Sequence, residues 1–188
     1  MDRVERLTRE DYFAAALGLL ADGGVGALTI ANLCDRLAVT KGSFYYHFAG
    51  IRTFHDAFLE HWETGRAYQL SEQVAAVSDP HERIELLKRL GVAVHHEAES
   101  AIRGWARTNP RVAAAQQRVD AARQHELATA FVAAGIQEEA AEVLARIGLT
   151  ILVGTQQMEE RVDRGRLAAL FDEYQRWLEA SAQLARPV

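Results

Sequence analysis

The chain has 188 residues, of which 49% are hydrophobic and 25% charged, and its net charge is −5. This composition is typical of a folded protein and excludes a disordered one. The apolar stretches are too short to cross a bilayer and residues 1–6 are too charged for a signal peptide, so we expect a cytoplasmic protein without a membrane partner. A single cysteine, Cys34, excludes an internal disulfide and a multi-thiolate metal site, and we expect it to be a small buried thiol.

Helix-capping residues divide the first fifty residues into three short helices. Thr8 and Asp11 are typical of a capping box that opens the first helix, and Asp22-Gly23-Gly24 is expected to end it. Thr29 is expected to cap a second helix, and Thr40 a third helix that follows within three residues. The second and third helices therefore meet at a very tight corner, which indicates a helix-turn-helix.

The rest of the chain continues with helical patterns. Apolar residues at helical spacing predict one long helix that follows Ala49-Gly50 and runs towards Val77. Further helices are expected after Asp79-Pro80, over residues 100–107, after Asn109-Pro110 as far as Gly135, from about Glu138, and around Leu167–Leu178. The run from Leu144 to Val153 is apolar on nearly every side, so we expect other protein to cover its whole circumference. No segment has the two-residue period of a strand, and we predict an all-α fold of about nine helices.

The third short helix carries the residues that predict a function. Phe44 and Phe48 lie four residues apart and are expected to point inward. The other side chains of this helix then point outward, and they are Lys41, Gly42, Ser43, Tyr45, Tyr46 and His47. Lysine and serine can bind guanine or phosphate, tyrosine and histidine can bind phosphate oxygens, and glycine permits close approach. A corner that merely packs would explain the two phenylalanines but not the crowd of polar and aromatic groups opposite them, and we interpret this helix as the one that reads DNA.

The charge of this region is unusual for a DNA-binding protein. Residues 1–66 contain seven lysines and arginines against nine aspartates and glutamates. The unpaired backbone N–H groups at the helix starts, Thr29 and Thr40, are expected to attract phosphate without adding formal charge. A helical binding module that kept the corner but lost DNA remains an alternative.

These residues resemble the tetracycline-repressor (TetR) family of regulators. From Thr29 to Phe48 the chain reads T-I-A-N-L-C-D-R-L-A-V-T-K-G-S-F-Y-Y-H-F, which is similar to the family pattern of a threonine, an alanine-containing second helix, a turn and then Lys-Gly-(Ser or Thr)-(Leu or Phe)-Tyr-x-His-Phe. The resemblance covers about residues 8–62. It implies that DNA contacts come from Thr40, Lys41, Gly42, Ser43, Tyr45 and His47, and that Tyr46 stands at a position that varies with the operator.

The chain departs from the family pattern at two positions. The turn glycine usual before Val39 is Ala38 here, and a left-handed backbone at an alanine would cost on the order of 1 kcal/mol. Many members have a lysine that touches phosphate three residues after the Phe48 equivalent. This chain has Ile51 followed by Arg52, and whether Arg52 takes over that contact is left open.

The C-terminal part resembles the family in layout only. We divide the chain into a DNA-binding domain of residues 1–52 and a ligand-binding and dimerisation domain of residues 53–188. A dimer interface is expected on the last two helices, at Ile147, Ile151, Leu167, Leu170, Phe171, Tyr174, Trp177 and Leu178. A ligand pocket between the middle helices would use Val94, Ile102 and Trp105, with polarity from His95, Glu99 or Arg123, although each could equally be ordinary core or surface.

The histidine pair followed by Glu99 raises the alternative of a metal enzyme. Adjacent histidines such as His95 and His96 point about 100° apart on a helix, so they cannot easily share one ion. No phosphate-binding loop, dinucleotide fingerprint or nucleophile elbow is present either. We therefore expect solvated helix surface here, with no catalytic residues, no metal and no cofactor.

The sequence thus predicts a homodimeric transcriptional regulator that responds to a small molecule. Two copies would place their reading helices at half-sites roughly 34–36 Å apart and bind a palindromic operator. The resemblance favours a repressor, because repression is the usual mode of control in the family.

Overall fold

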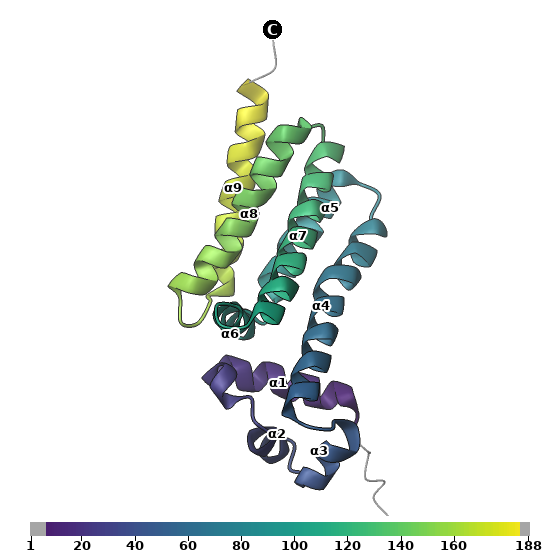
Figure 1. The fold of residues 1–188 in the computed structure, drawn as a ribbon. Coiled ribbons are helices and arrows are strands. Elements are labelled where there is room, and N and C mark those ends of the chain that lie inside the picture. Colours follow the sequence, from purple (N-terminus) through teal and green to yellow (C-terminus); the bar gives the residue numbers. More distant parts are fainter. Residues whose placement is uncertain (1–6, 185–188) are drawn as a thin grey trace, which may run out of the picture. The chain divides into compact units, whose positions relative to one another are not determined.

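The computed structural model describes residues 7–184, and the side chains of all of these except 67–69 and 181–184. Within this part the chain forms nine α-helices and one short 3₁₀ helix and no strand, so the predicted all-α fold is confirmed (Figure 1). The elements are α1 (Arg9–Gly23), η1 (Val25–Ala27), α2 (Ile30–Arg36), α3 (Lys41–His47), α4 (Ile51–Ala75), α5 (Pro80–Ala93), α6 (His96–Ala106), α7 (Pro110–Ala133), α8 (Glu138–Met158) and α9 (Arg164–Leu184). None of the described helices is long and apolar enough to span a membrane.

The capping residues predicted from the sequence begin and end several helices. Thr8 and Asp11 form the capping box of α1, in which the backbone N–H of Thr8 donates to Asp11 Oδ2 at 2.7 Å. This hydrogen bond holds the pKa of the Asp11 carboxyl below its usual value. Gly24 follows α1 with φ of 64°, and Gly135 follows α7 with φ of 94°, a left-handed region that glycine enters without a steric cost. The predicted stops are confirmed.

Proline-containing caps open α5 and α7 as predicted. The side chain of Asp79 accepts from the backbone N–H of Glu82 at 2.9 Å, and Asn109 Oδ1 accepts from that of Arg111 at 3.0 Å. The prediction for α6 is wrong by several residues, because the helix begins at His96 rather than near 100. The break lies at Val94, whose backbone is extended, and neither glycine nor proline marks it in the sequence.

The contacts divide the chain into two compact units. The first contains residues 7–68 together with 95–119, and the second contains residues 69–94 together with 120–184. This division does not follow the predicted boundary at 52/53. The predicted boundary divides a DNA-binding domain from a ligand-binding and dimerisation domain, a division by function that stays a prediction.

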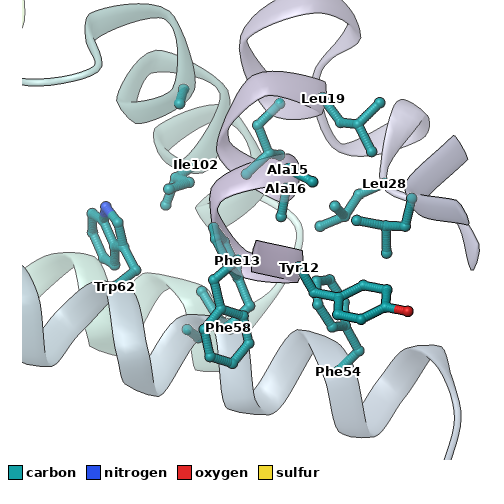
Figure 2. Packing of buried hydrophobic residues seen from close by; sticks show 14 of the residues in the cluster. Tyr12, Phe13, Ala15, Ala16, Leu19, Leu28, Phe54, Phe58, Trp62 and Ile102 are labelled. Atoms are coloured by element: carbon teal, nitrogen blue, oxygen red, sulfur yellow. The ribbon is translucent and has the colours of Figure 1, made fainter. Parts of the chain in front are cut away.

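Aromatic side chains form the core of the first unit (Figure 2). Phe13 on α1 faces Phe54 and Phe58 on α4, with ring centroids 6.0 and 6.3 Å apart. Ile102 on α6 is fully buried in the same cluster. Helix α1 thus packs against both α4 and α6, and burial of each of these large side chains contributes on the order of 1.5–3 kcal/mol.

The second unit is built from the end of α4, α5, the later part of α7, α8 and α9. Helices α8 and α9 lie side by side (Figure 1). Tyr174 on α9 donates a hydrogen bond to the Leu144 carbonyl of α8 at 2.5 Å. The expectation that α8 is covered all round is not met within this chain. Ile147 within the predicted run is 38% exposed, and Val143 just before the run is 60% exposed, so the helices packed against α8 leave part of its circumference open.

Candidate DNA-binding site

The corner between α2 and α3 is closed by backbone hydrogen bonds. The N–H of Val39 donates to the Cys34 carbonyl at 2.9 Å, and that of Ala38 donates to the Asp35 carbonyl at 3.2 Å. These two bonds form a Schellman motif, in which the residue after the C-cap is left-handed. Ala38 occupies this position with φ of 53°, so the conformation considered in the sequence analysis is the one adopted.

Replacing Ala38 by glycine should stabilise the protein slightly. A left-handed alanine costs about 1–2 kcal/mol, while the extra freedom of glycine in the unfolded chain costs about 0.4–1 kcal/mol. We expect a net gain of about 0.5–1 kcal/mol, seen as a rise of roughly 1–4 °C in thermal unfolding. The matched control is Ala14→Gly in the exposed middle of α1, which should lose about 1 kcal/mol. Equal losses in both variants would show that Ala38 is unstrained.

The two faces of α3 differ as predicted. Phe44 is fully buried and Phe48 is 2% exposed, and both contact Phe54 on α4, with centroid distances of 5.8 and 4.9 Å. On the outer face Tyr45 is 55% exposed and Tyr46 66% exposed. Lys41 and Gly42 are also exposed, whereas Ser43 and His47 are half-buried. The phenylalanines anchor α3 and leave its polar and aromatic groups facing outward.

The two predicted cap threonines behave differently. The Thr29 hydroxyl accepts from the backbone N–H of Asn32 at 3.2 Å, so the predicted cap of α2 is confirmed. Thr40 occupies the N-cap position of α3, but its side chain makes no capping hydrogen bond, and this part of the prediction is wrong. The backbone N–H of Ser43 donates to the Thr40 carbonyl instead, at 3.0 Å. Arg52, in the first turn of α4, is exposed.

Two titratable groups lie behind this surface. Cys34 is 3% exposed, as predicted, and burial together with the neighbouring Asp35 raises the pKa of its thiol, which keeps it protonated and unreactive. Burial lowers the pKa of His55 on α4, although its Nε2 lies 3.4 Å from the Leu28 carbonyl, a contact that acts in the opposite direction. The imidazole also meets the ring of Trp105 edge-on at 5.0 Å.

One residue of this site was missed in the sequence. Tyr12 on α1 is fully buried, and its hydroxyl donates a hydrogen bond to Ser43 Oγ at 3.0 Å. Its ring contacts the rings of Phe44, His47 and Phe48, with centroids 5.5–5.8 Å apart. Tyr12 precedes Ala16 by one helical turn, so the helical period could have placed it on the buried face; its hydroxyl partner, 31 residues away, could not be deduced.

The predicted ligand-binding residues fall in both units. Glu99, Ile102 and Trp105 are buried in the first, and Val94 and Arg123 lie in the second. His95 is exposed at the N-cap of α6.

The expectation of solvated surface on α6 is wrong for two residues. His96 and Glu99 are each only 2% exposed, because α6 packs against α1 and turns this face inward. Glu99 Oε1 pairs with Nε of Arg66 at 3.2 Å. No group of three potential metal-binding side chains is found among the residues with described side chains.

The predicted dimer residues have different surroundings. Leu167 and Phe171 are buried in the core of this chain, and Tyr174 and Leu178 pack against it. Ile151 is half-buried. Ile147, Leu170 and Trp177 are exposed, by 38%, 44% and 57%.

Helix α2 leads through a tight turn into α3, whose polar and aromatic groups face outward. This arrangement is the helix-turn-helix of DNA-binding regulators. Residues 13–56 match the family model of bacterial regulatory proteins of the tetR family. This match covers the helix-turn-helix segment and supports the resemblance to the family that the sequence showed.

Solved structures share the fold over most of their length. A transcriptional regulator from Rhodococcus sp. Rha1 is 18% identical, with a TM-score of 0.70 and coverage of 89% of this chain and 94% of its own. A TetR transcription regulator from Haloarcula marismortui is 20% identical, with a TM-score of 0.68 and coverage of 88% and 95%. A transcriptional regulator from Saccharomonospora viridis in complex with choline is 12% identical, with a TM-score of 0.72 and coverage of 88% and 94%. No curated protein matches the chain significantly.

Proposed function

We propose that this protein is a cytoplasmic, homodimeric repressor that binds a palindromic operator and is released by a small molecule. The observation that carries the DNA-binding part is the outer face of α3, where Tyr45 and Tyr46 are more than half exposed opposite the buried Phe44 and Phe48. Large aromatic side chains on the open face of so short a helix contribute little to folding. Facing DNA, they supply contact area and hydrogen bonds to phosphate oxygens.

The other exposed groups of α3 fit the same role. Lys41, in the first turn, can reach guanine or phosphate, and Gly42 lacks a side chain that would keep the backbone away from DNA. His47 and Ser43 add hydrogen-bonding groups at the margin of this face. Arg52 in α4 and Thr29 and Thr40 at the starts of α2 and α3 are proposed to contact phosphates. Together these contacts depend more on shape and hydrogen bonding than on bulk positive charge.

A direct test measures binding to the DNA upstream of the protein's own gene by gel shift and footprinting. We expect two protected half-sites with centres roughly 34–36 Å apart. Log affinity falls by about 0.9 per neutralised phosphate per decade of salt, so few ionic contacts should give a slope well below the roughly tenth-power dependence of a heavily basic repressor. Failure to bind any genomic fragment would contradict the proposal and favour a binding module that has lost DNA. A slope near the tenth power would contradict the proposed set of contacts.

The dimer is proposed to form through exposed apolar residues on α8 and α9. Val143 and Ile147 lie one turn apart on α8, and Leu170 and Trp177 lie two turns apart on the neighbouring α9. Two copies could bury these stripes against each other about a twofold axis. Leu167 and Phe171 then support the interface from within, because they hold α9 to the core of their own chain.

Replacing Leu170 by aspartate should convert the dimer to monomer. Because the interface is twofold, the dimer would bury the new charge twice. An uncompensated buried charge costs about 3–5 kcal/mol, so the dissociation constant of the dimer should rise by a hundredfold or more. Sedimentation velocity at micromolar protein measures this. Val132→Asp on α7 is the matched control, because Val132 is also 44% exposed and lies outside the two stripes. A Leu170→Asp protein that stays dimeric would place the interface elsewhere.

The effector is proposed to bind in the C-terminal domain and to act on DNA binding through α4. This helix continues from the corner that carries α3 into the second compact unit, so a ligand that shifts it could change the separation of two reading heads. A coupling of about 1–3 kcal/mol, or 5–150-fold in affinity, is sufficient. The choline complex of the Saccharomonospora viridis regulator supports a small-molecule effector for this fold. The effector contacts suggested by the sequence stay a prediction, and they are Val94, His95, Glu99, Ile102, Trp105 and Arg123.

A further inference from the structure

The hydrogen bond between α1 and α3 points to a second role for the buried Tyr12. Figure 2 shows its hydroxyl at the end of the ring that points away from Phe13 and Phe58. The phenol donates to Ser43 Oγ at 3.0 Å. Its ring meets Phe44 and Phe48 edge-on, with interplanar angles of 77° and 82°, which fixes the direction in which the hydroxyl points. The ring therefore packs against α3, while the hydroxyl donates its hydrogen bond to one atom of that helix, Ser43 Oγ.

This bond determines what the Ser43 hydroxyl can offer. A serine oxygen has two acceptor lone pairs and one hydrogen, and a phenol is the more acidic of the two hydroxyls and so the better donor. Once Tyr12 occupies one lone pair, the hydrogen of Ser43 must point away from Tyr12. Serines in helices often turn this hydrogen back to a carbonyl one turn earlier. Within the part of the chain that the structure describes, Tyr12 is the only hydrogen-bond partner found for the Ser43 hydroxyl.

Ser43 stands where such a hydrogen could reach DNA. It lies in the first turn of α3, between the exposed Lys41 and Tyr45, and is itself half-buried. Its backbone N–H already donates to the Thr40 carbonyl at 3.0 Å, so the side chain carries its remaining donor. Phosphate oxygens and the N7 and O6 atoms of guanine are all acceptors.

We propose that Tyr12 is a positioning residue that makes Ser43 a hydrogen-bond donor to an acceptor atom of DNA. The role rests on the DNA-binding function proposed above and extends the reading surface to a buried residue of α1. Tyr12 touches no DNA itself. It acts by holding the Ser43 oxygen in place and by directing its hydrogen outward.

A double-mutant cycle of Tyr12→Phe and Ser43→Ala tests this role. The probe is a duplex that the wild-type protein enriches from a random-sequence library, and affinity is measured by fluorescence anisotropy. Ser43→Ala should weaken binding by about tenfold, as expected for loss of one hydrogen bond to a charged or strongly accepting group, and Tyr12→Phe by about three- to tenfold. The double variant should bind like Ser43→Ala alone, because the phenol acts only through Ser43.

The variants also separate this role from simple packing. Tyr12→Phe keeps the ring and its contacts, so thermal unfolding should change by no more than a few degrees. Binding of Tyr12→Phe equal to wild type, or effects that multiply independently in the double variant, would overturn the proposal. A wild-type protein that enriches no duplex would instead contradict the DNA-binding function, and the role of Tyr12 with it.

The sequences that each variant enriches identify the acceptor. A loss in Ser43→Ala that is uniform across sequences assigns the hydrogen bond to a phosphate. Relaxed preference at one base pair assigns it to a base edge. In either case Tyr12→Phe should reproduce the same pattern in weaker form, and a different pattern would contradict a route through Ser43.

Discussion

Replacing Phe44 by alanine is expected to lower the free energy of unfolding by about 3–5 kcal/mol, the range observed when a fully buried phenylalanine is truncated. Phe44 is 0% exposed and contacts Tyr12 on α1 and Phe54 on α4, with ring centroids 5.8 Å away in both cases. Alanine would leave a cavity where three helices meet. Because the aromatic rings of α1 and α4 hold α3 in place, the cavity should also weaken the packing of α3 against these two helices.

Urea unfolding followed by circular dichroism measures this loss. The matched control is Tyr46→Ala, two residues along the same helix, where the side chain is 66% exposed. Surface substitutions usually change stability by no more than about 0.5 kcal/mol. Similar losses for Phe44→Ala and Tyr46→Ala would contradict the assignment of an inner and an outer face to α3.

Removing the guanidinium of Arg66 should have the second largest effect. Its Nε lies 3.2 Å from Oε1 of Glu99, whose side chain is only 2% exposed, while the arginine side chain is 26% exposed. Breaking a buried ion pair from one side costs about 3–5 kcal/mol, because a charge stays behind in a medium of low polarity. Since Arg66 is partly exposed, Arg66→Met is expected near the lower end, at about 3 kcal/mol.

A second substitution distinguishes the charge from the packing. In the double variant Arg66→Met with Glu99→Leu both charges of this ion pair are removed, and a large part of the lost stability should return. The control is Arg118→Met, which removes the partner of Glu63 at a site where the arginine is 58% exposed and where about 1 kcal/mol or less is at stake. If the double variant loses as much unfolding free energy as the two single variants together, the attraction between the two charges does not hold the pair.

The sequence predicted the fold wherever the rules are local. The caps at Thr8, Asp79 and Asn109 each use a side chain and a backbone group within three residues, so their pattern is visible in the chain itself. The inner and outer faces of α3 follow from helical periodicity in the same way. The family pattern has glycine at the position of Ala38, and this raised the possibility of the left-handed turn that the structure shows there.

Contacts between distant residues could not be predicted. The burial of Glu99 depends on Arg66 and on the packing of α6 against α1, and a charged residue on a helix is ordinarily on the surface. The start of α6 follows an extended backbone at Val94 that no breaker residue marks. Tyr12 acquires its partner Ser43 only when α1 and α3 meet.

The outer face of α9 is a mixed case. Helical periodicity identified an apolar stripe, but periodicity alone does not distinguish residues that face the core of the chain from those that face a second copy. Leu167 is fully buried, whereas Leu170 and Trp177 are 44% and 57% exposed on the same helix. Among the residues of α9 that the sequence had grouped together, the exposed fractions therefore favour Leu170 and Trp177 as the ones that face a second copy.

The affinity of α3 variants for DNA tests the central claim most directly. The measurement compares wild type with Lys41→Ala and Tyr45→Ala on the duplex that the wild-type protein enriches, with Arg107→Ala as a control that removes an exposed cation from the end of α6. We expect each α3 variant to bind about tenfold or more weakly with unchanged thermal unfolding, since each loses a hydrogen bond worth about 1.5–3 kcal/mol at a charged partner, and Arg107→Ala to bind like wild type. Wild-type affinity in both α3 variants, with folding intact, would show that α3 does not read DNA.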